Sequence, residues 1–184
     1  MRFAYYDRLS PAQKRTYRRS DELGALALPP DVDCGTIVAS VRESLASDRR
    51  APLQRACQAL CDELTAGYHV PPVRLLVLAR RPSDDYGELH GLYEPEEGRR
   101  IARITVWMRT AAKQQVVAFK SFVRTVVHEV AHHLDYELFA LDETFHTEGF
   151  YKRESSLANA LFAQEAARQG GAAPECASTG RSRE

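Results

Sequence analysis

Two histidines and a glutamate stand in a spacing that can bind a metal ion and use it. In the stretch TVVHEVAHHLDYELF (125–139), His128 and His132 are four residues apart and Glu129 follows the first. Residues four apart lie on the same face of an α-helix, so both imidazoles can hold one ion. Zinc accepts imidazole nitrogen and lowers the pKa of a bound water to roughly 7. A glutamate beside that water can take its proton, which predicts a Zn²⁺ cofactor with Glu129 as the catalytic base.

A third protein ligand must come from outside this part of the helix. Catalytic zinc sites use three protein ligands and keep one position open. We choose His146, which lies fourteen residues after His132, beyond a break in the helical pattern. Phe150 follows four residues later, where it can pack inward and hold the segment that carries His146. Glu143 and Glu148 are the alternative third ligands, and the residue types alone leave that choice open.

Other polar residues near the motif have supporting roles or none. Asp135 shares a helix face with His132, and we expect it to orient a ligating histidine rather than to bind the metal. His133 points about 100° away around the helix, so we expect a polar contact or a surface position for it. Tyr151 and Arg109 are two candidates for stabilising an oxyanion, and nothing in the pattern selects between them.

The motif lies in the second half of a long amphipathic helix. Apolar residues three to four apart predict this helix over about 112–138. They are Val116, Phe119, Val123, Val126, Val127, Val130 and Leu134. A break follows at about 140–144, and a last helix is predicted over about 147–168. A histidine at the start of that last helix can therefore be delivered to the first two.

The segments before the motif predict helices followed by strands. Helical patterns cover about 10–19, 34–47 and 51–66, and Ser10-Pro11 is typical of a helix start. Short apolar or alternating runs predict strands at 73–80, 86–93 and 101–108, with turn residues PSDD after the first. The stretch EPEEGRR predicts a hairpin loop between the second and third strands. Together with the later helices, this pattern predicts an α+β fold.

Length and composition favour a single globular domain. We assign residues 1–168 to that domain, with a helical part at 1–70 and the sheet and active-site helices at 71–168, and expect a disordered tail at 169–184. Lysine plus arginine and aspartate plus glutamate are 25 each, so net charge gives no reason to expect nucleic acid or a membrane as partner. No apolar run resembles a signal peptide or a membrane span, and the four cysteines have no disulfide pattern. We therefore expect a cytoplasmic protein.

The motif and the segment after it resemble the short zincin metallopeptidases. The residues that carry the resemblance are HEVAHHLDY followed by HTEGF, downstream of a strand that contains a tryptophan. The SprT-like and WLM-like groups are similar in pattern, with a helix bearing HExxH and a third histidine in a segment H-x-x-x-F. The matching residues here are His128, Glu129, His132, His146 and Phe150.

The resemblance covers about residues 73–162 and implies both a fold and a function. The implied fold is a small zincin-like domain, in which a mixed or antiparallel sheet of three to four strands packs on the HExxH helix. The implied ligands are His128, His132 and His146, with Glu129 as general base. The strand before the helix, here 101–108, would be an edge strand that binds an extended peptide by backbone pairing.

The function expected from these residues is zinc-dependent hydrolysis of peptide bonds in a protein or peptide substrate. Two alternatives stay open at this stage. One is a non-catalytic zinc-binding or protein-interaction module with the same fold. The other is a DNA-associated SprT-like protease that uses the basic residues between 2 and 19 as an arm. The chain departs from many SprT-like proteins because it has no CxxC pair for a zinc ribbon.

Overall fold

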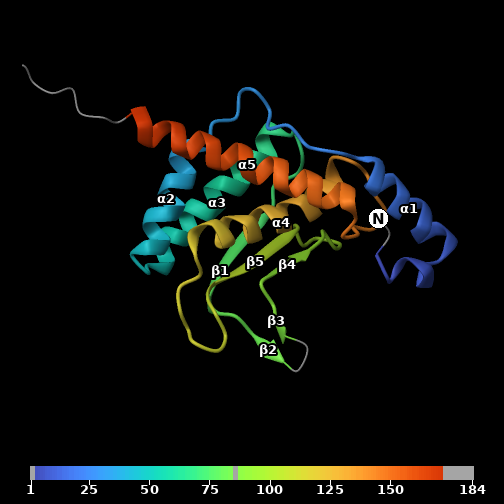
Figure 1. Ribbon diagram of the computed structural model, residues 1–184, viewed down its shortest axis with the longest axis horizontal. Coiled ribbons are helices and arrows are strands. Elements are labelled where there is room, and N and C mark those ends of the chain that lie inside the picture. The colour runs from blue at the N-terminus through green and yellow to red at the C-terminus, as the bar shows by residue number, and fades with distance from the viewer. Residues whose placement is uncertain (1–2, 85–86, 172–184) are drawn as a thin grey trace, which may run out of the picture.

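The structure is a computed structural model that describes residues 3–84 and 87–171. Within them it has an α+β fold with five α-helices and a small mixed sheet (Figure 1). The helices are α1 (Pro11–Glu22), α2 (Gly35–Ala46), α3 (Arg50–Gly67), α4 (Phe119–Glu137) and α5 (Glu148–Gly171), and a 3₁₀ turn η1 spans Tyr6–Arg8. The strands are β1 (Arg74–Arg80), β2 (Ser83–Asp84), β3 (Gly87–Glu88), β4 (Gly91–Glu94) and β5 (Arg103–Arg109).

The main sheet has three strands in the order β1-β5-β4. β5 pairs with β1 in parallel and with β4 in antiparallel orientation. The strand expected at 101–108 is therefore central, and its prediction as an edge strand was wrong. The edge strand beside α4 is β4, and the predicted hairpin loop connects it to β5. Pairing order depends on contacts far apart in the sequence, so the alternating pattern of one strand does not determine it.

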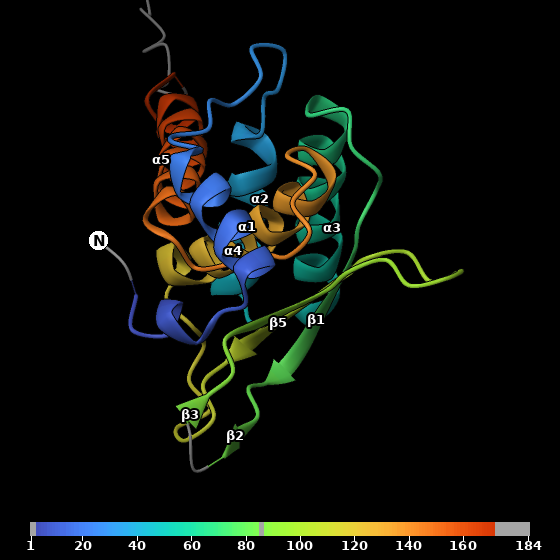
Figure 2. The same cartoon turned by 90° about the vertical axis from the view of Figure 1, so that its right-hand side faces the viewer.

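The five helices lie on one side of the main sheet, while the β2–β3 ribbon projects from the other end of the molecule (Figures 1 and 2). One apolar core joins the sheet to α2, α3, α4 and α5. α4 contributes its buried stripe to this core, namely Phe122, Val123, Val126, Val127, Val130 and Leu134. Burial of this stripe fixes the rotation of α4 about its axis, and so fixes where the motif residues point.

The start of α1 was predicted from the sequence, whereas the start of α4 was not. Ser10 caps α1 and forms a capping box with Gln13, as the Ser10-Pro11 pair predicted. The helix expected from 112 begins only at Phe119. Residues before it form a turn in which Gln114 has a φ of 51° and the Val117 N–H donates to the carbonyl of Met108. Val116 and Val117 keep their inward positions without being helical, so apolar spacing alone misplaced this boundary.

Several smaller expectations also changed. The strand expected at 86–93 is interrupted, since β3 and β4 are separate, and Tyr86 lies outside the described residues. The turn expected at PSDD contains β2, which pairs with β3. α5 continues to Gly171, so the expected tail cannot begin at 169, and 172–184 lie outside the described residues.

Two further sequence expectations concern cysteines and membrane spans. Cys34, Cys57 and Cys61 are buried free thiols, and Cys176 lies outside the described residues. In the described part of the chain, no helix is long and apolar enough to cross a lipid bilayer.

Candidate metal centre

The first two histidines lie on the flank of α4, next to its buried stripe. His128 and His132 are one turn apart and half-buried, and both face the segment that connects α4 to α5. We call this segment, residues 138–147, the ligand loop. Since the core fixes the rotation of α4, neither imidazole can turn away without a change of rotamer.

The ligand loop brings His146 back to α4. Ala140 has a φ of 48°, a left-handed conformation that reverses the chain, and the Leu141 N–H donates to the carbonyl of Asp135. The loop ends at Thr147, whose hydroxyl accepts from the backbone N–H of Phe150 at 3.0 Å and so caps α5. His146 is thereby held one residue before the cap.

The three imidazoles meet at their Nε2 atoms. The Nε2 atoms of His128 and His146 are 3.0 Å apart, those of His132 and His128 are 3.2 Å apart, and those of His146 and His132 are 3.1 Å apart. Tetrahedral zinc with bonds of about 2.0–2.1 Å separates its ligand atoms by about 3.3 Å. The three nitrogen atoms therefore have the spacing of ligands that could share one ion, and they form a group able to hold a metal.

Hydrogen bonds on the other ring nitrogens direct the lone pairs to the same point. The Nδ1 atom of His128 lies 2.9 Å from a carboxylate oxygen of Glu154, which can only accept, so Nδ1 is the donor. The Thr144 hydroxyl donates to Asp135 at 3.0 Å and accepts from Nδ1 of His132 at 2.7 Å. In the neutral rings, both Nε2 atoms then carry lone pairs. Lone pairs facing each other at 3.2 Å repel, and a cation between them removes the repulsion.

Sequence reasoning missed Glu154 and Thr144 and identified Asp135 only in part. Asp135 acts on His132 through the Thr144 hydroxyl rather than by direct contact. A signal for Glu154 was present, because it lies four residues after Phe150 and therefore on the same face of α5. Thr144 gave no local signal, since its position depends on the path of the ligand loop.

Phe150 packs inward, as its spacing predicted, and its ring lies beneath all three imidazoles. Its ring centroid is 5.1 Å from that of His128, 4.7 Å from that of His132 and 5.2 Å from that of His146. The side chain is fully buried, so it ties the start of α5 to the core. A rigid apolar floor of this kind limits the rotamers available to the three rings.

Glu129 is buried between α4 and the edge strand β4. Its side chain is 5% exposed and lines the same hollows as His128. Burial raises the pKa of Glu129 to about 7, His128 opposes that shift, and Glu154 adds to it. A carboxyl group with a pKa near neutrality can accept and return a proton at physiological pH.

Two adjoining hollows open over the histidines along β4. Gly91, His128 and Glu129 line both of them, and their volumes are ≈ 350 Å³ and ≈ 260 Å³. The first has a mixed lining, to which Glu88, His90, Arg124, Thr125 and Glu154 also contribute. The second is more apolar and is also lined by Leu92, Tyr93, Pro95, His132, Tyr136, Thr144 and His146. A larger hollow of ≈ 660 Å³ lies by the β4–β5 loop and contains none of the histidines.

The alternative third ligands are engaged elsewhere. Both Glu143 carboxylate oxygens accept from the Gln13 side-chain amide at 3.1 Å, and Glu148 pairs with Lys152 at 2.9 Å. Both glutamates are exposed, and neither lines the two hollows over the histidines. His146 is the residue that the fold brings to His128 and His132.

The other residues considered from the sequence lie at different distances from the metal centre. His133 is fully buried and makes polar contacts, with the Tyr93 hydroxyl at 3.1 Å and with the carbonyl of Pro71 at 2.8 Å. Arg109 bonds to the Gln114 carbonyl and to Asp48 at the far end of β5, so it cannot serve this site. The Tyr151 ring centroid lies 5.9 Å from that of His146, which keeps Tyr151 at the border of the site.

The arrangement combines three converging nitrogen donors, an adjacent carboxyl group and open space beside them. Such a site could hold a divalent ion with at least one free position, and could move a proton next to it. Comparisons with protein-family models, with curated proteins and with solved structures found no match to this chain.

Proposed function

We propose that this chain is a zinc-dependent metallopeptidase with a zincin-like fold. The observation that carries the proposal is the convergence of three Nε2 atoms within 3.0–3.2 Å of each other, beside the buried carboxyl group of Glu129. Imidazole ligands favour zinc over calcium or magnesium, which prefer oxygen. Zinc held there would supply a Lewis acid that polarises a carbonyl group and lowers the pKa of water.

The chain's own residues would carry the proton transfers. Glu129 takes a proton from the attacking water molecule and delivers it to the nitrogen of the leaving amine. A bound cation would lower the raised pKa of Glu129 towards the ordinary value, which favours the ionised carboxylate that accepts the first proton. Glu154 and Thr144 accept from the Nδ1 atoms and keep the two imidazoles of α4 in the ligating tautomer.

The edge strand β4 gives the site a place for an extended peptide. β4 has β5 on one side and no other strand in the main sheet on its second side, within the described residues. Gly91, Leu92 and Tyr93 of β4 line the hollows over the histidines. A peptide paired with β4 would place its backbone alongside the metal centre, and its side chains would alternate between the hollows and solvent. This supports a protein or peptide as the substrate.

The two alternative functions have less support. A closed structural zinc site needs a fourth protein ligand, and Glu143, the candidate that the sequence offered for that position, bonds instead to Gln13. A nucleic-acid arm needs free basic side chains. Four of the basic residues at 2–19 instead donate within the chain: Lys14, Arg15, Arg18 and Arg19.

Peptide-library digestion by the zinc-loaded protein tests the proposal, with Glu129→Gln as the matched control. Glutamine keeps the size and shape of the side chain but does not accept the proton. We expect cleavage by the wild type and a loss of about 10²-fold or more in Glu129→Gln, with zinc content unchanged. Equal cleavage by both proteins would assign the activity to a contaminant or to another site. Zinc binding without any cleavage would favour the non-catalytic module.

A further inference from the structure

The N-terminal segment packs against the ligand loop, although more than a hundred residues separate them in sequence. We call residues 3–23 the N-terminal clamp; α1 within it lies at the end of α4 and α5 that carries the ligand loop (Figure 1). Three of its side chains reach this loop without being buried. They are Tyr5, which donates to the His146 carbonyl at 3.1 Å; Gln13, which donates to Glu143 at 3.1 Å; and Arg19, which donates to the Phe139 carbonyl at 2.8 Å and the Ala140 carbonyl at 3.3 Å.

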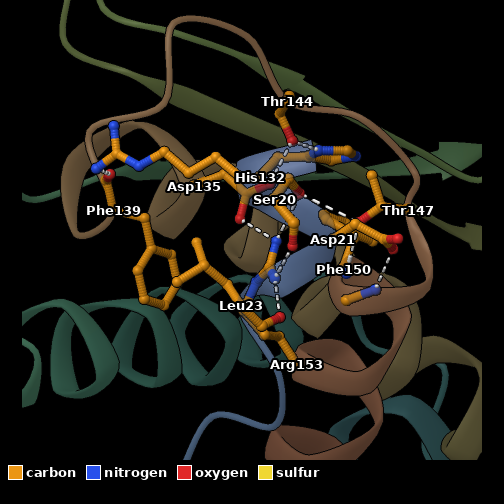
Figure 3. A network of polar contacts seen from close by, with 12 residues as sticks. Ser20, Asp21, Leu23, His132, Asp135, Phe139, Thr144, Thr147, Phe150 and Arg153 are labelled. Atoms are coloured by element: carbon orange, nitrogen blue, oxygen red, sulfur yellow. Dashed lines mark hydrogen bonds and ion pairs between the residues drawn. The ribbon is translucent and has the colours of Figure 1, made fainter. Parts of the chain in front are cut away.

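A buried arginine links the clamp to the histidines. Arg153 on α5 is 2% exposed and donates to the carbonyls of Ser20 and Leu23 at the end of α1 (Figure 3). The same guanidinium donates to Asp135 at 2.7 Å, and Asp135 accepts from Thr144. Thr144 in turn accepts from His132, as described above. One continuous set of hydrogen bonds therefore runs from the end of α1 to Nδ1 of His132, the ring nitrogen opposite the one that faces the other two histidines.

A glycine permits the close approach of the clamp to α5. A Cβ atom added at Gly149 would lie 2.4 Å from the Ser20 carbonyl oxygen and 2.7 Å from those of Asp21 and Leu23. The Gly149 N–H also donates to the Asp21 carboxylate at 3.2 Å, and the Ser20 and Thr147 hydroxyls are 3.2 Å apart. Any side chain at 149 would push the clamp away from the segment that carries His146.

We propose that the N-terminal clamp is a positioning element of the metal centre, which holds His146 and Thr144 at the distance from α4 that the metal requires. This proposal rests on the metal centre of the proposed function. It also assigns a role to one basic residue of the N-terminal segment, because Arg19 donates hydrogen bonds to two carbonyls of the ligand loop. Loops without such ties open locally at little free-energy cost, which would leave only two ligands in place.

The test uses the full chain with three changes in the clamp: Tyr5→Phe, Gln13→Glu and Arg19→Gln. Glutamate at 13 keeps the acceptor for the Ser10 N–H and removes the amide donor to Glu143. The three changes remove side-chain bonds to the ligand loop and leave the core untouched. Arg42→Gln is the control. It removes a bidentate ion pair with Glu165, at 2.8 Å, which links α2 to α5 away from the ligand loop. The readouts are zinc affinity by chelator competition and amide hydrogen exchange of residues 139–147 in metal-free protein.

We expect the triple variant to bind zinc about tenfold more weakly and to exchange faster at residues 139–147, with neither change in Arg42→Gln. Gly149→Ala should give a larger loss of affinity in the same direction. Unchanged affinity and unchanged exchange in the triple variant would overturn the clamp while leaving the peptidase proposal intact. If the wild type bound no zinc, the proposed function would fall, and equal exchange in the metal-free proteins would overturn the clamp separately.

Discussion

Gly91 on β4 and Glu129 on α4 are in such close contact that a Cβ atom added at Gly91 would lie 2.2 Å from Oε1 of Glu129. The edge strand therefore forms one wall around the carboxyl group of Glu129, the proposed general base. Because α4 is held by the core, a side chain at position 91 would have to displace either β4 or the Glu129 carboxyl group. The position of the Glu129 carboxyl group and that of β4, the strand proposed to bind a peptide, are thus coupled.

The first prediction follows from this contact. Gly91→Ala should lower kcat by up to about 100-fold, because a displacement of roughly 1 Å in a catalytic group can cost that much. Zinc affinity should stay within about twofold of the wild type, because none of the three histidines is touched. Steady-state kinetics and zinc titration of the same preparation check both parts. A variant with wild-type kcat would show that Glu129 is not held by β4 in the working enzyme.

The second prediction concerns the residues that bind the Nδ1 atoms. Glu154→Gln and Thr144→Val should each weaken zinc binding by about 10–100-fold, because they free the imidazoles to rotate or change tautomer. Chelator competition measures the affinity. Gln58→Ala is a suitable control, because Gln58 bonds to the backbone of β1 and Asp62, away from the site. If both variants bound zinc as tightly as the wild type, Glu154 and Thr144 would not be needed to orient the two imidazoles.

Some features of the site could be predicted from the sequence, and others could not. The pairing of His128 with His132 and the inward position of Phe150 depend on helical spacing alone, which is local and was predicted. The approach of His146 needed a chain reversal at Ala140, for which the sequence showed only a break in the pattern. β4 rather than β5 is the edge strand, and this order depends on pairing between segments distant in the chain. The contact of Thr144 with His132 likewise depends on the path of the ligand loop. No periodicity in one segment records such contacts.

The third prediction is a pH dependence of stability in metal-free protein. Burial, together with His128 and His146, lowers the pKa of His132 to about 3, whereas an unfolded chain has a histidine pKa of about 6.5. Between these values the unfolded state binds one more proton at His132, so the contribution of His132 to stability falls as pH decreases from about 6.5 towards 3. Glu129, whose pKa burial raises to about 7, contributes in the opposite direction between about pH 7 and 4.5, so the His132 contribution is isolated by comparison with a variant.

Urea unfolding in the presence of chelator at pH 7.0, 6.0 and 5.0 measures this dependence. Relative to the wild type, His132→Gln should lack a pH dependence that corresponds to about a quarter of a proton at pH 7.0 and nearly one proton at pH 5.0, because its side chain does not titrate. The same slope in the variant and in the wild type would mean that other groups account for the pH dependence. Zinc-loaded wild type should be more stable than metal-free protein at pH 7, because the ion binds the folded chain preferentially.

The most direct test of the central claim is the metal content of protein purified without added metal, compared between the wild type and His146→Ala. Elemental mass spectrometry should find one zinc per chain in the wild type and a large loss in His146→Ala, because two histidines on one helix bind far more weakly than three converging ones. The absence of zinc from the wild type, with none taken up on titration, would contradict the metal centre. Full retention of zinc in His146→Ala would contradict the assignment of the third ligand.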